Sequence, residues 1–166
     1  TIITNRAISQ IEYQYELPFN ATVMGGAKYT YIKPKVHAYN KEISEFRIDP
    51  FISYKQNLIH TVDITANVRQ LYVSKYDSPV SPSLGIDALV WSTTDQSFKI
   101  KASWGKSYKI PTFNDRYWYP NGNPDLKPES GNSYEASLIY SCFSNNFDFQ
   151  YKIGGFSLLI DNWIQW

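Results

Sequence analysis

Apolar and polar side chains alternate along most of this chain, and this period of two restricts its fold more than any other feature. From residue 58 to residue 72 the even positions are mostly apolar, whereas the odd positions carry hydroxyl, amide and charged groups. Successive side chains of a β-strand point to opposite faces, whereas an α-helix repeats every 3.6 residues. The alternation recurs along the chain. It predicts eight strands, at residues 6–17, 21–34, 43–54, 58–74, 84–92, 98–108, 132–143 and 147–164.

The connections between these strands alternate strictly between short and long. The short ones, which are rich in turn-forming residues, lie near residues 18–20, 55–57, 94–96 and 144–146. The long ones cover about 35–42, 75–83 and 109–131. An up-and-down antiparallel meander with all its short turns at one end has this rhythm. A transmembrane β-barrel has it too, because its periplasmic turns are short and its extracellular loops are long.

The predicted strands are long, whereas strands in soluble proteins most often have about five or six residues. Residues 58–72 extend over about 46 Å at roughly 3.3 Å per residue. At a tilt of about 45° they rise roughly 33 Å, enough for an apolar band of about 25 Å with its aromatic girdles. Aromatic rings favour membrane interfaces, and predicted strand ends carry Tyr31, Tyr54, Tyr72, Trp91, Trp104, Tyr108, Trp163 and Trp166. We therefore predict an all-β chain of antiparallel, up-and-down transmembrane barrel strands.

Composition excludes several other classes of protein. With 16 basic and 15 acidic side chains, the net charge of +1 argues against a nucleic-acid-binding surface. No apolar run approaches the length of a membrane-spanning helix, and a single cysteine, Cys142, excludes a disulfide within the chain. His37 and His60 are isolated and have no acidic residue at metal-ligand spacing. We therefore predict no metal site, no cofactor and no catalytic residues.

Two local features predict irregularities in the strands. The apolar positions of the last strand shift from odd to even numbers at Gly154-Gly155, as an extra residue in a β-bulge would produce. Pro50 lies inside a predicted strand and has no N–H to donate, which predicts a bulge or a local edge.

The most distinctive sequence begins in the strand predicted at 98–108. Residues 102–118 read ASWGKSYKIPTFNDRYW, residues 122–129 read GNPDLKPE, and residues 133–135 read SYE. This order resembles the C-terminal half of the barrel in TonB-dependent outer-membrane receptors, where a strand ending like SYGxGFRAPT leads to NELYW, GNPDLKPE and a strand with YE near its start. The segment FSLLIDNWIQW at 156–166 is similar to the family's FYxxIDNWIQW strand. The resemblance covers about 102–166 and is nearest to the cobalamin and siderophore branch.

The resemblance implies that residues 1–166 are part of a receptor β-barrel domain, with about eight strands of a larger barrel. The plug domain and the strands that close the barrel are then expected outside this sequence. The implied function is active import of a scarce large nutrient, a corrinoid such as vitamin B12 or a ferric siderophore, energised through the protein TonB acting on the plug. The expected partners are TonB, the nutrient ligand and the lipid of a Gram-negative outer membrane, which the strands cross several times. Nucleic acid and enzymatic activity are not expected.

Ligand contacts are expected from aromatic and polar residues of the longest loop, namely Arg116, Tyr117, Trp118, Tyr119 and Asn121. Packing within the loop or an aromatic girdle is the alternative for each. For the family motif we expect a structural role, because Pro residues and Asx side chains favour a rigid turn; the motif comprises Asn123, Pro124, Asp125, Leu126, Lys127, Pro128 and Glu129. Charged residues on the odd positions are expected to line the lumen around a plug domain, to pair with one another or simply to face water: Asp63, Arg69, Asp87, Lys99 and Lys101.

Two alternatives from other classes remain open at this level. The first is a complete small eight-stranded outer-membrane barrel with an adhesive or structural role, in which residues 6–17 pair with residues 147–164. The second is a soluble carbohydrate-binding β-sandwich, in which the aromatic residues fill a sealed core.

Overall fold

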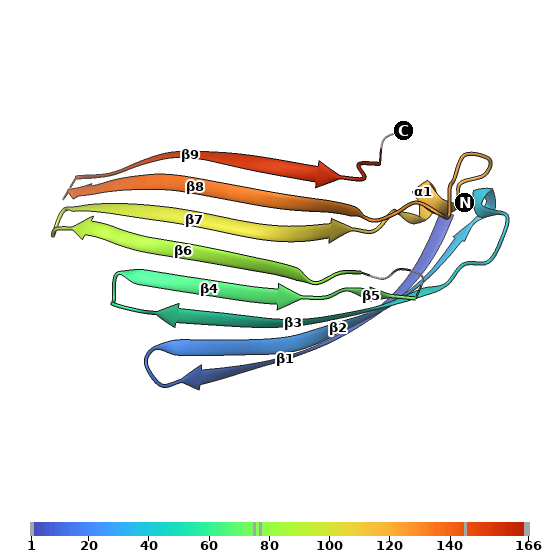
Figure 1. Cartoon of the computed structure of the whole chain (residues 1–166), viewed down its shortest axis with the longest axis horizontal. Helices are drawn as coiled ribbons and strands as arrows, with labels where there is room; N and C mark the ends of the chain where they lie inside the picture. Colours follow the sequence, from blue (N-terminus) through green and yellow to red (C-terminus); the bar gives the residue numbers. More distant parts are fainter. Residues whose placement is uncertain (1, 75, 77, 145, 165–166) are drawn as a thin grey trace.

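In the computed structural model, which describes residues 2–74, 76, 78–144 and 146–164, the chain forms a single antiparallel sheet (Figure 1). A 3₁₀ helix, η1 (His37–Tyr39), and a helix of five residues, α1 (Phe113–Tyr117), lie in the connections. Neither is long and apolar enough to cross a membrane. The strands are β1 (Ile2–Leu17), β2 (Ala21–Val36), β3 (Glu45–Asn57), β4 (Val62–Arg69), β5 (Tyr72–Val73), β6 (Ser81–Ser92), β7 (Gln96–Lys109), β8 (Glu129–Ser144) and β9 (Phe147–Asp161).

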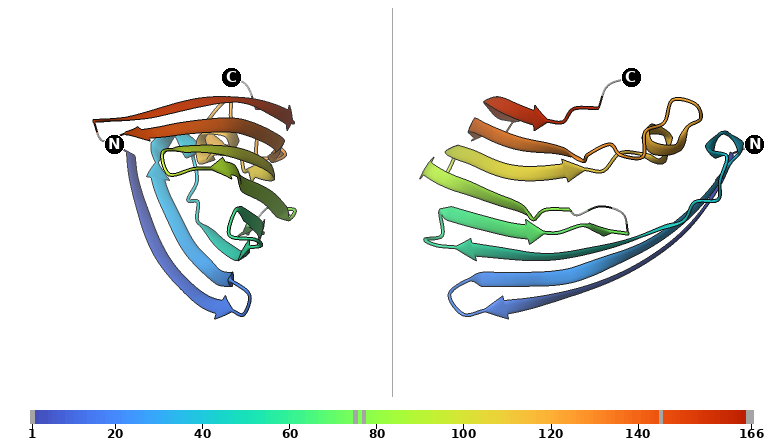
Figure 2. Two further views of the ribbon diagram at one scale, coloured as in Figure 1. Left: turned by 90° about the vertical axis from the view of Figure 1, so that its left-hand side faces the viewer. Right: turned by 45° about the vertical axis from the view of Figure 1, so that its right-hand side comes forward.

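The strands follow one another through the sheet in chain order, except that the short β5 pairs with β3. The sheet is curved and open (Figure 2), and β1 and β9 are its two edges. A complete eight-stranded barrel requires its first and last strands to pair, and β1 and β9 do not. The predicted all-β, antiparallel, up-and-down arrangement is confirmed.

Short turns lie at one end of the sheet and long connections at the other (Figure 1). Turns of a few residues join β1 to β2, β3 to β4, β6 to β7 and β8 to β9. Longer segments join β2 to β3, β4 to β6 and β7 to β8. The predicted rhythm is therefore correct. We call the end with the long connections the loop end.

The strand register separates an apolar face from a polar face, because directly opposed residues project from the same side of a sheet. From β1 to β8 one row of paired residues is wholly apolar or aromatic: Tyr15, Val23, Tyr54, Ala66, Leu84, Trp104 and Tyr134. The row ends on β9 at Ser157. The adjacent row on the opposite side is mostly polar or small: Gln14, Met24, Ser53, Asn67, Ser83, Gly105 and Ser133.

No second sheet covers the apolar face in the part of the chain that the structure describes. Leu84 and Ile86 on this face keep 52% and 43% of their surface exposed. A β-sandwich needs the apolar sides of two sheets packed together, so the single sheet rules out the soluble sandwich. The face is instead a broad apolar surface, of the kind that a membrane would cover.

The strand predicted at 58–74 is wrong in its extent. Residues 58–61 form the turn after β3, with His60 in the left-handed region at φ 44°. Pairing with β3 ends at Arg69 and resumes at Tyr72 in β5. Pro50 lies opposite this break and accepts a hydrogen bond from the Gln70 backbone N–H at 3.1 Å. The local edge predicted at Pro50 is thus confirmed, because proline has no N–H to continue the ladder.

The height expected for the sheet was calculated from the strand predicted at 58–74, but other strands supply it. β1, β2 and β8 have 16 residues each, enough to cross an apolar band of about 25 Å when tilted.

The β-bulge predicted at Gly154-Gly155 is also wrong. These residues pair with Ser137 and Ala136 in an unbroken register, so the apolar residues that follow move to the polar face. A Cβ on Gly154 would lie 2.8 Å from the Ala136 carbonyl oxygen, a close approach that only glycine allows. The described register shifts instead between Leu89 and Trp91, where no glycine or proline marks it.

Candidate functional site

The loop end is organised around α1, which follows β7 in the longest connection. Thr112 caps this helix: its hydroxyl accepts the backbone N–H of Asp115 at 3.2 Å, and the Asp115 carboxylate accepts the backbone N–H of Thr112 at 2.6 Å. This reciprocal pair is a capping box, which satisfies two N–H groups that lack a partner within the helix. It allows five residues to form a defined helical turn.

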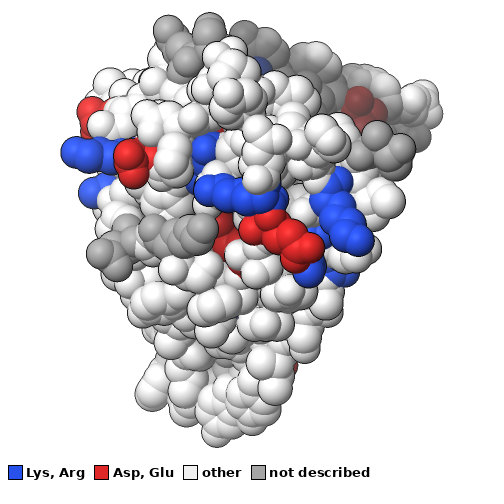
Figure 3. Space-filling view, turned by 90° about the vertical axis from the view of Figure 1, so that its right-hand side faces the viewer, with Lys and Arg blue, Asp and Glu red and all other residues white. Residues whose placement is uncertain are grey.

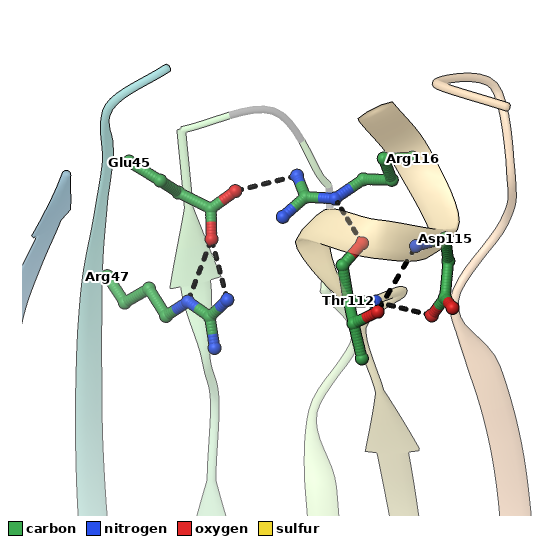
Figure 4. A network of polar contacts seen from close by, with 5 residues as sticks. All are labelled: Glu45, Arg47, Thr112, Asp115 and Arg116. Atoms are coloured by element: carbon green, nitrogen blue, oxygen red, sulfur yellow. Dashed lines mark hydrogen bonds and ion pairs between the residues drawn. The ribbon is translucent and has the colours of Figure 1, made fainter. Parts of the chain in front are cut away.

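Arg116 extends from α1 onto β3 and is 1% exposed. Its Nη1 donates to Glu45 Oε2 at 2.7 Å, and its Nε donates to the Thr112 carbonyl at 3.2 Å (Figure 4). The second oxygen of Glu45 accepts from Arg47 Nε at 2.8 Å. One buried carboxylate therefore bridges two guanidinium groups. We call Glu45, Arg47, Thr112, Asp115 and Arg116 the rim network.

Aromatic rings surround the Arg116 guanidinium, whose central carbon lies 4.8, 5.1 and 5.3 Å from the ring centroids of Phe113, Tyr117 and Tyr76. Rings attract a cation at this range. Burial by itself lowers the pKa of Arg116, but the hydrogen bond and charge of Glu45 outweigh it and raise the pKa above its ordinary value. Arg116 therefore remains charged inside the rim. Its Nη2 and the Tyr76 hydroxyl have no hydrogen-bond partner among the described residues.

A second set of contacts joins α1 to η1 in the β2–β3 connection. The Tyr39 hydroxyl donates to Asn114 Oδ1 at 2.5 Å, and the Tyr119 backbone N–H donates to the Ala38 carbonyl at 2.9 Å. Tyr39 packs with Ile43 and Tyr117 in a small apolar core. Burial raises the pKa of the Tyr39 hydroxyl. The rim network and these contacts together hold the long connections in one arrangement.

The structure separates the five predicted ligand contacts into two groups. Arg116 and Tyr117 are buried at 1% and 7% exposure, and both belong to the packing just described. Trp118 and Tyr119 are exposed at 38% and 67%, and Asn121 is exposed as well. The loop thus turns its first half inward and its second half outward.

Sequence reasoning missed Glu45 and Tyr39, the partners of Arg116 and Asn114. Each lies more than 70 residues before its partner. Glu45 continues the odd, polar positions of β3 and so looks like any lumen-facing side chain. No local signal marks either residue, because the contact exists only when the connections come together.

The family motif after α1 makes contacts of a structural kind. Asn123 accepts the Asp125 backbone N–H at 2.9 Å, and its own N–H donates to the Asp115 carbonyl at 2.8 Å. Glu129, at the start of β8, pairs with Lys109 at 3.2 Å and accepts the Ile164 backbone N–H at 2.8 Å. These bonds close the loop and join the ends of β7, β8 and β9. The other motif residues are Pro124, Leu126, Lys127 and Pro128; Pro124 and Lys127 are exposed, and Leu126 and Pro128 are half-buried.

Charged residues on the polar face pair across strands. Lys101 forms an ion pair with Asp87, and Arg69 forms one with Asp49. Viewed from the loop end, basic and acidic side chains form a mixed band rather than a patch of one sign (Figure 3). Within the described ranges, no group of three or more His, Cys, Asp or Glu side chains could hold a metal ion.

Residues 5–166 match the model of a family described as TonB dependent receptor-like, beta-barrel. Over 68 residues, 41% of this chain, the sequence is 41% identical to the vitamin B12 transporter BtuB of Photobacterium profundum. Over 37 residues it is 54% identical to the vitamin B12 transporter BtuB of Vibrio vulnificus. These matches span only 11% and 6% of the lengths of those proteins.

Two solved structures share the fold over nearly the whole chain. The siderophore receptor PirA from Pseudomonas aeruginosa has a TM-score of 0.70 at 15% identity, and the match covers 95% of this chain and 31% of that one. PirA from Acinetobacter baumannii has a TM-score of 0.66 at 15% identity, with 96% and 34% covered. The chain therefore spans about a third of the length of these receptors.

Proposed function

This chain belongs to the family of TonB-dependent receptor β-barrels. We propose that its strands form part of the barrel wall of an outer-membrane receptor and that its long connections form part of the rim at the loop end. The receptor imports a scarce, large nutrient such as a corrinoid or a ferric siderophore. TonB energises the import through a plug domain inside the barrel. The role is transport and not catalysis.

The observation that carries this proposal is the separation of the two faces from β1 to β8. A membrane barrel needs apolar side chains towards lipid and polar side chains towards a wet lumen. The row from Tyr15 to Tyr134 meets the first requirement, and the row from Gln14 to Ser133 meets the second. In the parent barrel further strands cover the edges of β1 and β9, since unpaired backbone groups are costly in lipid.

Ligand capture is assigned to the exposed second half of the long loop. Trp118 and Tyr119 offer rings, and Asn121 offers an amide, which together suit a large, flat ligand with few charges. Arg116 and Tyr117 support these residues from below through the rim network and the Tyr39 core. Their proposed contribution to binding is therefore indirect.

The test is uptake of cyanocobalamin and of a ferric siderophore by cells that express the full receptor as their only importer. We expect uptake of one nutrient that is lost when TonB is deleted. Trp118→Ala combined with Tyr119→Ala should weaken nutrient binding about tenfold or more, as loss of two aromatic contacts does. Phe19→Ala, which removes an exposed aromatic ring from a turn at the opposite end, is the matched control.

Uptake that persists without TonB would contradict the energy coupling. Equal binding by the double variant and the Phe19 control would contradict the assignment of the loop.

A further inference from the structure

We infer that a cavity between β6 and β7 at the loop end binds a phosphate-type oxyanion. Pairing between these strands stops at Ser83 and Gly105, although β7 continues to Lys109. Pro79 and Pro82 have no N–H to donate to a longer ladder. The strands diverge at the loop end (Figure 1) and leave a cavity of about 320 Å³.

The lining of this cavity is rich in hydrogen-bond donors. It contains four serines, one asparagine, two cationic side chains and no carboxylate. Arg69 donates to Asp49 through Nε and Nη2, which leaves its Nη1 free of that pair. Asp49 offsets the charge of Arg69, so the other cationic side chain of the lining is Lys106, whose ammonium lies 5.4 Å from the centroid of the Tyr108 ring.

Ser78 supplies an independent reason to expect a ligand. This residue lines the cavity and is 7% exposed, and its hydroxyl has no hydrogen-bond partner among the described residues. A buried polar group without a partner is unfavourable. A bound oxyanion would offer the Ser78 hydroxyl an acceptor, and its charge would attract the Lys106 ammonium.

The chemistry of the donors favours phosphate. A phosphate group has at least three strong acceptor oxygens, and cationic donors form its strongest hydrogen bonds. A carboxylate would leave more of the serine hydroxyls without an acceptor. Lys106 and Tyr108 stand on the apolar-face positions beyond Trp104, whereas Ser83 and Ser107 stand on polar-face positions. The cavity therefore meets both faces of the sheet, and its phosphate can come from a lipid headgroup outside or from a nutrient inside.

The experiment is calorimetric titration of the full receptor in detergent with inorganic phosphate, against chloride at equal ionic strength. Lys106→Gln should weaken phosphate binding about tenfold, the effect of one charge-assisted hydrogen bond. Ser78→Ala should weaken it about threefold, the effect of one neutral hydrogen bond. Lys99→Gln, an exposed lysine on the same strand outside the cavity, should leave it unchanged. Lys106→Arg should retain binding, and thermal unfolding of each variant verifies its fold.

Competition then identifies the source of the phosphate. If lipid A displaces phosphate and dephosphorylated lipid A does not, the site is assigned to a lipid headgroup. Cyanocobalamin, which carries a phosphodiester, assigns it to the nutrient if it competes instead. The inference is overturned if phosphate does not bind, or if it binds equally to the wild-type protein and to the Lys106→Gln and Ser78→Ala variants. Because no transport is measured, this failure is distinct from a failure of the proposed import function.

Discussion

The rim at the loop end and the wall of strands are stabilised by different interactions. The wall is held by backbone ladders between consecutive strands, and its side chains sort by local alternation. The rim depends on contacts between residues far apart in sequence, with a buried ion pair at its centre. The strands therefore depend mainly on backbone pairing, whereas the loop end depends on a few specific side-chain pairs, so the loss of one partner there should have the larger effect.

The largest effect is expected from breaking the rim network at Glu45. Glu45→Ala leaves the buried Arg116 guanidinium without its carboxylate, and removing one partner of a buried pair costs about 3–5 kcal/mol. The measurement is denaturant unfolding of the full receptor in detergent, together with hydrogen exchange of residues 110–128.

Glu42→Ala is the matched control, since Glu42 is 81% exposed and pairs with Lys33 at 3.1 Å. Exposed pairs contribute about 0–1 kcal/mol. Equal losses in the two variants would show that the burial of the Glu45 pair has no energetic consequence. Replacing Glu45 and Arg116 together by leucine should cost less than Glu45→Ala, because no charge then remains unpaired.

Among the strands, a charged substitution should lower the stability of the folded barrel only on the apolar face that we propose contacts lipid. Ile86 lies on that face, 43% exposed. Ile86→Arg should destabilise the folded barrel in lipid vesicles by about 2–4 kcal/mol if Ile86 lies near the bilayer midplane. Ser103→Arg on the polar face is the control, and we expect it to change stability by less than about 1 kcal/mol. A larger loss for Ser103→Arg would reverse the assignment of the two faces.

The strands could be predicted from the sequence because the face from which a side chain projects follows from its position in the local alternation. Alternation gave the strands and the position of the turns, and Pro50 revealed a local edge because its missing N–H is a local property. The predicted bulge at Gly154-Gly155 is wrong because the apolar positions also change from odd to even when apolar residues occupy the polar face without any change of register. The strand predicted at 58–74 extends too far, because Leu58 continues the apolar even positions into the turn.

The rim was only partly predictable. The loop sequence identified the region, and the aromatic content around Arg116 suggested contacts. Whether Arg116 faces a ligand or the protein depends on Glu45, which lies 71 residues away. The burial of Arg116 depends on how three connections pack together. No sequence pattern within a single connection predicts it.

A smaller effect is expected from the helix cap of the rim. Thr112→Ala removes the hydroxyl that accepts the Asp115 N–H, and such a loss costs about 1 kcal/mol. Thr112→Ser keeps the hydroxyl and should remain near the wild-type value. The measurement is hydrogen exchange at Asp115, which should accelerate only in the alanine variant. Equal exchange in both variants would show that the cap does not hold α1.

The smallest effect concerns Tyr39 and pH. Burial raises the pKa of its hydroxyl, while the charge of Arg116 lowers it less. The folded rim therefore favours the neutral phenol. Its contribution is fully present below the unfolded tyrosine pKa of about 10 and is lost as pH rises through the higher folded value. Exchange of the rim amides should accelerate above about pH 10, beyond the base-catalysed trend of the strand amides, and Tyr39→Phe should remove this excess. An excess that persists in Tyr39→Phe would mean that another group titrates in the rim, and Tyr76, whose pKa burial also raises, is the next to replace.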